Sequence, residues 1–244
     1  MWRARSVAFV RLRSCGGTQH VITFEPRLDV LPAPQRAFWP ELARTPEHFT
    51  LYGGTALALR LGHRVSADFD FFSNQPFDPD RLARSVPYLA KAERVQVDAN
   101  TLTCRLERGG PVLVSFFGAL GLGQTTPREQ THGLPLHVAS LLDLAGTKAA
   151  VVQKHAEEKD YLDIDALIGN GVELPRALAA SVVIYGPSFN PLISLKALSY
   201  FDDVPALPQD VRARLKAAVA AVDVARLPML TPYRLHVDES GHAS

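Results

Sequence analysis

The chain has 244 residues, of which 47% are hydrophobic and 21% are charged, proportions that are ordinary for a globular protein. Its 26 basic and 25 acidic side chains leave a net charge of +1, so overall charge does not draw it to nucleic acid or to an anionic membrane. No stretch approaches the roughly 18 consecutive apolar residues of a membrane-spanning helix, and we expect no membrane partner. The two cysteines, Cys15 and Cys104, lack metal-ligand spacing, which favours a reducing, cytoplasmic compartment.

The first part of the chain predicts short helices and strands around a glycine turn. Residues 1–30 are expected to form an N-terminal extension, followed by a short helix within residues 35–43. FTLY, at residues 49–52, is typical of a strand, and TALALRLG, at residues 55–62, has the apolar spacing of a helix that packs on a sheet. SADFDFF, at residues 66–72, alternates polar and apolar residues as a strand with one wet face does.

Further along, the pattern changes from strands to helices. A helix is expected over residues 78–92, and TLTCRLE and PVLVSFFG form a predicted hairpin whose turn is at residues 108–110. Later helices are predicted over residues 141–156, 158–169, 194–203 and 210–222. We therefore expect an α+β fold: a mixed β-sheet with flanking helices at residues 31–138, a helical C-terminal part at residues 139–230, and a tail at residues 231–244.

A strand, two glycines and a helix form an arrangement that suits phosphate binding. Gly53 and Gly54 let the backbone approach an anion, and the free N–H groups at the start of the next helix favour negative charge there. Thr55 adds a hydroxyl group. Taken alone, the same residues also fit a simple tight turn.

Asp68 and Asp70 lie on one face of the predicted strand, roughly 6 to 7 Å apart. Two carboxylates at that spacing can share a hard divalent cation such as Mg²⁺, which also binds substrate phosphates. The alternative is a solvent-exposed pair, or one neutralised by Arg60 or Arg64. Because the glycine turn lies only some 15 residues away in sequence, the two motifs together favour the cation site.

GGTALALRLGHRVSADFDFF resembles the signature of the nucleotidyltransferase superfamily, in which a Gly-Gly turn precedes an Asp-x-Asp strand. In detail it is similar to the AbiEii/AbiGii toxin family of nucleotidyltransferases. Later blocks also resemble that family, and the resemblance spans roughly residues 48 to 208: VLVSFFG, HVASLLDLAGTKAAVV, EEKDYLDIDALI and NPLISLKALSYFDDVP.

The resemblance implies a transferase that moves a nucleoside monophosphate from an NTP to an acceptor, with Mg²⁺ or Mn²⁺ as the metal. It implies that Asp68 and Asp70 hold the metal and that Lys148 reaches the nucleotide. It also implies that Asp160 faces the active site and orients a basic residue. Lys159, which it also places at the NTP, is the first candidate, and Lys154 and His155 are next in line. The remaining residues that it places at or near the NTP are Gly53, Gly54, Thr55, Arg64 and Ser66.

The chain departs from the superfamily pattern at Ser115. Nucleotidyltransferases usually supply a third carboxylate from a neighbouring strand, and VLVSFFG has a serine at that position. A serine hydroxyl is neither a base near neutral pH nor a charged metal ligand. Glu107, on the partner strand of the hairpin, could substitute only if its side chain pointed to the same face.

Three functions therefore compete. The first is an active toxin that modifies RNA, tRNA among the candidates, or a protein, and that has a cognate antitoxin. The second is a nucleotide-binding or regulatory protein without turnover, and the third is an NTP-dependent phosphotransferase. An RNA acceptor requires a basic groove near the metal site. The candidates for its side chains are Arg60, Arg64, Arg81, Arg84, Lys91 and Arg94.

Overall fold

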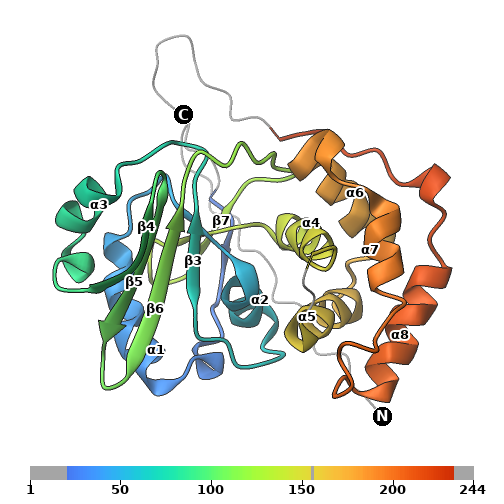
Figure 1. The fold of residues 1–244 in the computed structure, drawn as a ribbon, viewed down its shortest axis with the longest axis horizontal. Helices are drawn as coiled ribbons and strands as arrows, with labels where there is room; N and C mark the ends of the chain where they lie inside the picture. The colour runs from blue at the N-terminus through green and yellow to red at the C-terminus, as the bar shows by residue number, and fades with distance from the viewer. Residues whose placement is uncertain (1–20, 155–156, 234–244) are drawn as a thin grey trace, which may run out of the picture.

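The computed structural model describes residues 21–154 and 157–233, which fold around one eight-stranded mixed sheet (Figure 1). In the order of the sheet, the strands are β1 (Thr23–Phe24), β7 (Glu129–Thr131), β8 (His137–Val138), β2 (Thr50–Tyr52), β3 (Phe69–Phe72), β6 (Pro111–Phe117), β5 (Thr101–Glu107) and β4 (Glu93–Asp98). The sheet and its helices confirm the α+β class.

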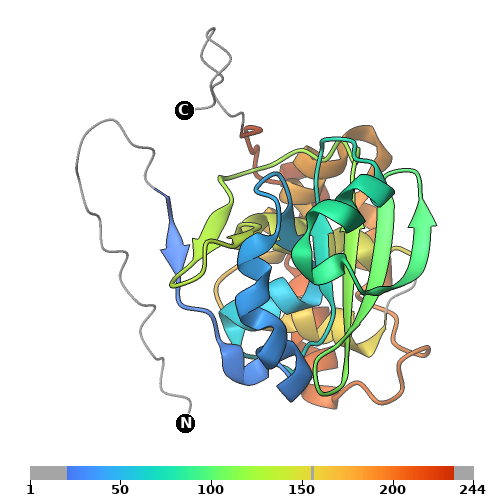
Figure 2. The ribbon, with the colours of Figure 1, turned by 90° about the vertical axis from the view of Figure 1, so that its left-hand side faces the viewer.

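One face of the sheet carries an aromatic core. It is covered by α1 (Ala33–Phe38), the 3₁₀ helix η2 (Trp39–Arg44), α3 (Pro79–Ser85) and the 3₁₀ helix η3 (Pro87–Leu89), with α1 and α3 in front of the strands in Figure 2. Phe38 packs edge-on against Phe69 of β3, with ring centroids 5.8 Å apart, and against Tyr88 of η3 at 5.1 Å. These contacts fix the apolar side of β3, and alternation along the strand sends Asp70 to the other side.

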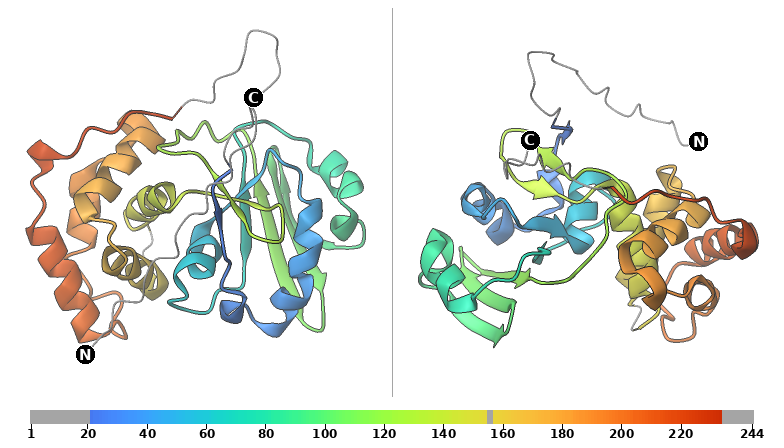
Figure 3. Two further views of the ribbon diagram at one scale, coloured as in Figure 1. Left: turned by 180° about the vertical axis from the view of Figure 1, so that it is seen from behind. Right: turned by 90° about the horizontal axis from the view of Figure 1, so that it is seen from above.

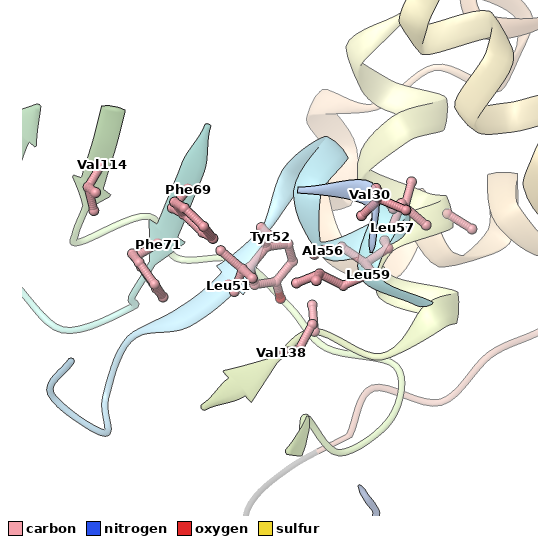
Figure 4. Packing of buried hydrophobic residues seen from close by; sticks show 14 of the residues in the cluster. Val30, Leu51, Tyr52, Ala56, Leu57, Leu59, Phe69, Phe71, Val114 and Val138 are labelled. Atoms are coloured by element: carbon pink, nitrogen blue, oxygen red, sulfur yellow. The ribbon is translucent and has the colours of Figure 1, made fainter. Parts of the chain in front are cut away.

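The opposite face of the sheet is approached by α2 (Gly53–Leu61) and by the helical part of the chain. Figure 4 shows Phe69, Phe71 and Val114 on one side of β2, and Ala56, Leu57 and Leu59 of α2 on the other. The helical part comprises α4 (Leu141–Val151), α5 (Glu158–Gly169), α6 (Leu174–Tyr185), α7 (Pro191–Ala197) and α8 (Gln209–Ala220). In the views from behind and above, these helices form a second body beside the sheet (Figure 3).

Helix α6 is absent from the sequence prediction and is central to the helical part. A side chain at Gly146 of α4 would begin 3.0 Å from Ala180 Cβ and 2.8 Å from Ile184 Cδ1, so glycine lets the two helices approach closely. Ser181 Oγ donates a hydrogen bond to the Gly146 carbonyl at 2.7 Å. The sequence of α6 carries an amphipathic period at least as clear as that of α4 or α5, so this helix could have been predicted.

Several element boundaries differ from the prediction. The helix expected over residues 78–92 is divided into α3 and η3, since Pro87 cannot continue the hydrogen-bonding pattern of α3. The helix expected within residues 35–43 begins at Ala33 and continues as η2. The short strands β1, β7 and β8, and the edge strand β4, were also not predicted. In β4 all six residues are exposed, although Val95 and Val97 alternate with polar residues as in a strand.

Within the described residues, no single helix is long and apolar enough to cross a membrane. Two segments, Glu158–Gly169 and Leu174–Ser188, reach that length and composition only when taken together, and they are bent by 116° relative to one another.

Candidate active site

The glycine turn lies where β2 ends and α2 begins. Gly53 has a φ of +74°, and a Cβ atom there would lie 3.0 Å from Asp70 Oδ2, so backbone conformation and close approach both favour glycine. The residue before α2, Tyr52, provides no side-chain cap. The first N–H groups of α2 therefore remain available to an anion beside the Asp70 carboxylate.

Thr55 and Ser66 hold the loop that leads to the two aspartates. The Thr55 hydroxyl donates to the Asp68 carbonyl at 2.5 Å and lies 2.8 Å from Ser66 Oγ. Thr55 is almost fully buried. In this structure its hydroxyl positions Asp68, and its contact with a triphosphate stays a prediction.

Asp68 and Asp70 differ in environment. Asp68 is exposed just before β3, whereas Asp70 is half-buried inside the strand. Burial, followed by the charge of Asp68, raises the pKa of Asp70 to about 6, while Lys148 and a hydrogen bond from Ser115 act in the opposite direction. Two carboxylates that disfavour each other's charge fit a site completed by a cation.

The neighbouring basic side chains do not neutralise this pair. Arg64 binds Asp163, with Nε to Oδ1 at 2.6 Å. Arg60 binds Glu129, with Nη1 to Oε2 at 2.7 Å. Neither Arg60 nor Arg64 therefore neutralises the charge of Asp68 and Asp70. The oxygen ligands of these two aspartates fit a hard divalent cation.

Ser115 lies beside Asp70 and occupies the expected position of the third carboxylate. Strands β3 and β6 are parallel and pair Asp70 with Ser115, and the next strand, β5, pairs Thr103 with Ser115. Thr103 Oγ1 donates to Ser115 Oγ at 3.2 Å. Glu107 pairs with Pro111 next to the hairpin turn, away from Ser115 and Asp70, so its side chain cannot supply the third carboxylate. Among the described residues, no third His, Cys, Asp or Glu joins the pair as a metal ligand.

Lys148 links two buried aspartates of α5. Its Nζ lies 2.8 Å from Asp160 Oδ1 and 2.6 Å from Asp163 Oδ2, and all three side chains are more than nine-tenths buried. This arrangement corrects the predicted pairing of Asp160 with Lys159. Lys159 is exposed and binds Glu157 at 2.9 Å instead, because the first turn of α5 directs its side chain away from Asp160.

Asp163 lies at the centre of this cluster, and the sequence analysis assigned it no role. Its carboxylate accepts hydrogen bonds from His63 Nε2 at 2.7 Å and from Arg64 Nε and Nη2 at 2.6 and 2.9 Å. Burial alone would raise the pKa of Asp163, but His63, Arg64 and Lys148 together hold it well below its usual range. The spacing of three residues between Asp160 and Asp163 was the available signal, since it places both on one helix face.

Arg64 lies between Asp163 and the glycine turn. Its Nη2 occupies the space that a Cβ atom at Gly54 would need, and Ser66 Oγ lies 3.4 Å from that position. Arg64 is thus next to the start of α2, as predicted, with its guanidinium already bound to a carboxylate. Its direct contact with an NTP stays a prediction.

The six basic side chains that were predicted to form a groove near the metal site do not come together in the structure, so this prediction is wrong. Arg60 is buried, with a side chain 8% exposed, and it donates to Glu129 and to the Ala139 carbonyl. Arg81 and Arg84 belong to α3, which covers the face of the sheet opposite Asp70 (Figure 2). Sequence alone does not assign a helix to one face of a sheet, which is why this error arose. The His155 contact considered for Asp160 lies outside the described residues.

A glycine turn at a helix N-terminus, facing an Asp-x-Asp strand, suits the binding of phosphates together with a divalent cation. Residues 41–229 match the family model described as the nucleotidyl transferase AbiEii toxin of type IV toxin–antitoxin systems. The chain belongs to this family. This result confirms the resemblance noted in the sequence.

The chain is also similar to individual proteins. An uncharacterized protein of Aquifex aeolicus is 32% identical over 158 residues, which are 64% of this chain and 74% of that protein. Among solved structures, the nucleotidyltransferase toxin MenT4 of Mycobacterium tuberculosis aligns with a TM-score of 0.49 and 18% identity, over 80% of this chain and 87% of that one. A putative nucleotidyltransferase from H. pylori aligns with a TM-score of 0.48 and 16% identity, over 76% and 89% of the two chains.

Proposed function

We propose that the protein is a cytoplasmic toxin that uses Mg²⁺ or Mn²⁺ to transfer a nucleoside monophosphate from an NTP to an RNA, such as a tRNA, or to a protein. The observation that carries this proposal is the contact between the glycine turn and Asp70, where Oδ2 lies 3.0 Å from the position of a Gly53 Cβ. Family membership supports the reaction class. A cognate antitoxin is the expected partner.

Each part of the site has a defined task in this reaction. The N–H groups at the start of α2 bind the phosphates, and glycine at residues 53 and 54 allows the close approach. Asp68 and Asp70 would hold the divalent cation, which when bound orients the triphosphate and offsets its charge. The acceptor oxygen then bonds to the α-phosphorus as the bond to the bridging oxygen breaks, the acceptor proton passes to solvent, and pyrophosphate leaves.

The buried ion network positions the two aspartates. Asp163 holds His63 and Arg64, which lie in the loop between α2 and β3, and Thr55 binds the end of that loop at the Asp68 carbonyl. Lys148 connects the same network to α4. The helical part thereby fixes the loop that carries Asp68, which is the kind of preorganisation that phosphoryl chemistry requires.

Ser115 gives specific support to a second candidate, a nucleotide-binding protein with little turnover. Its hydroxyl can donate to Asp70 but cannot take the proton that leaves the acceptor near neutral pH. The two candidates make different predictions, because a binding protein retains metal-dependent NTP affinity without forming a product.

The test uses NTPs labelled at the α or the γ phosphate, incubated with Mg²⁺ and total cellular RNA. Nucleotidyl transfer places the α label on RNA or protein and releases the γ label as pyrophosphate. Transfer of the γ label would contradict the proposal in favour of a phosphotransferase. NTP binding without transfer of either label, with RNA and protein acceptors both supplied, would favour the binding protein.

A further inference from the structure

A hollow of about 960 Å³ opens near the end of β3, on the same sheet face as Asp70. Its walls include Tyr52, which pairs directly with Asp70 across β2 and β3, and Phe72, two residues beyond Asp70. Because directly paired residues and alternate residues share a face of the sheet, the two rings lie beside the catalytic carboxylate. The volume lies in the upper part of the range of small-molecule sites.

The aromatic floor of the hollow consists of two side chains, Tyr52 and Phe72. The rings of Tyr52 and Phe72 are stacked, with centroids 4.8 Å apart and an interplanar angle of 15°. Phe117 of β6 contacts Phe72 edge-on at 5.5 Å but does not line the hollow. Tyr52 is buried and covers one face of the Phe72 ring, whereas Phe72 is partly exposed, so the exposed part of its ring is available to an apolar ligand.

Polar groups surround this aromatic floor. Arg128 lines the hollow and is anchored by a hydrogen bond of 2.6 Å from Nη1 to the Glu47 carbonyl. His137 also lines it, and its buried Nδ1 has no hydrogen-bond partner among the described residues. Burial and the neighbouring charge of Arg128 lower the pKa of His137 to about 4, so its imidazole is neutral at pH 7. The lining of the hollow therefore offers both donors and acceptors.

We propose that this hollow is a nucleobase-binding subsite of the transferase. A partly exposed aromatic ring with hydrogen-bond donors and acceptors around it matches a heteroaromatic base, which proteins bind through contact with aromatic side chains and through hydrogen bonds along the edges of the base. The inference rests on the proposed function. The base belongs either to the NTP, whose phosphates bind at the glycine turn, or to the end of an RNA acceptor. Both ligands present the same kind of heteroaromatic base.

The first test is Phe72→Leu, which removes the exposed ring and keeps an apolar side chain. Calorimetric titrations with each NTP, with inorganic tripolyphosphate and with a short single-stranded RNA separate the sources of the base. We expect the Kd of at least one NTP, or of the RNA, to rise by about tenfold while tripolyphosphate binding is unchanged. A change for the NTP assigns the base to the donor, and a change for the RNA alone assigns it to the acceptor.

Unchanged binding of all NTPs and of RNA would overturn the subsite, as would an equal loss of tripolyphosphate binding. Phe117→Leu is the matched control, because it makes the same substitution on the adjacent strand outside the hollow, and an equal effect there would also overturn it. His137→Ala provides a second variant that leaves the aromatic floor intact and should weaken the same ligand. The proposed function is judged separately, by α-label transfer in Asp70→Asn.

Discussion

Asp163 joins three segments that are distant in sequence. Its buried carboxylate binds His63 and Arg64 from the loop before β3, and Lys148 from α4. The residue types of the site were readable from the sequence because Asp68, Asp70 and the glycine turn form a local motif. The partners of Asp163 were not, since a bond between residues about 100 positions apart depends on how α5 docks against α2.

Replacement of Asp163 by Asn should be strongly destabilising, by about 3–5 kcal/mol, because it leaves buried cations without their carboxylate. The low folded-state pKa means that the stabilisation by Asp163 is present above the unfolded pKa of about 3.8 and is lost as pH falls below it. Urea unfolding at pH 7 measures the loss. Asp165→Asn on the same helix is the control, because Asp165 pairs with the half-exposed Arg214 and should cost less than about 1 kcal/mol.

Replacement of Asp70 by Asn should stabilise the metal-free protein at pH 7 by about 1–3 kcal/mol. Because the folded-state pKa of about 6 exceeds the usual 3.8, the charge on Asp70 costs stability, and the advantage of the variant should grow as pH rises from about 4 to 6. Thermal unfolding in EDTA across that range checks this. A variant that is less stable than the wild type at pH 7 would contradict our account of the pair.

At the scale of elements, the parallel pairing of β3 with β6 determines what Ser115 does. The order of strand, turn, helix and strand at the glycine motif was predictable, and so was the hairpin of β5 and β6. The register that sets Ser115 beside Asp70 was a prediction from family resemblance, and the structure confirms it. Helix α6 is missing from the prediction although its sequence carries an amphipathic period comparable to that of the other helices.

Ser115→Asp should add a third carboxylate to the site. The added charge should destabilise the metal-free protein by on the order of 1 kcal/mol and strengthen Mg²⁺ binding, because a hard cation gains an oxygen ligand. Unfolding in EDTA and Mg²⁺ titration measure the two effects. Ser115→Asn, which has similar size without charge, should give no gain in Mg²⁺ affinity. Equal affinities of the Asp and Asn variants would show that residue 115 does not face the metal.

The packing of α4 against α6 should be sensitive to the side-chain volume at residue 146. Gly146→Val places new atoms against Ala180 and Ile184 and should destabilise by about 1–3 kcal/mol. Gly169→Ala is the comparison, since a Cβ there meets no other atom within 4 Å. Chemical unfolding of both variants measures the difference, and equal stabilities would argue against close packing of these helices.

In the whole molecule, the Asp70 face of the sheet lies toward the helical part, while α1 and α3 cover the other face (Figure 1). Composition and pattern predicted these two parts of the chain. They did not assign the arginines of α3 to a face, because the same amphipathic helix can pack on either side of a sheet. In the proposed reaction the acceptor is therefore recognised by groups on the Asp70 face, where the hollow beside Phe72 is the proposed subsite for the base of the NTP or of the acceptor.

The most direct test of the central claim is α-label transfer from NTP, with Mg²⁺ and cellular RNA, in the wild type and in Asp70→Asn. Asp80→Asn is the matched control, because Asp80 forms an exposed pair with Arg94 on the far side of the sheet. We predict transfer by the wild type and by Asp80→Asn, and loss of at least about 100-fold in Asp70→Asn. Undiminished transfer in Asp70→Asn would contradict the assignment of the active site.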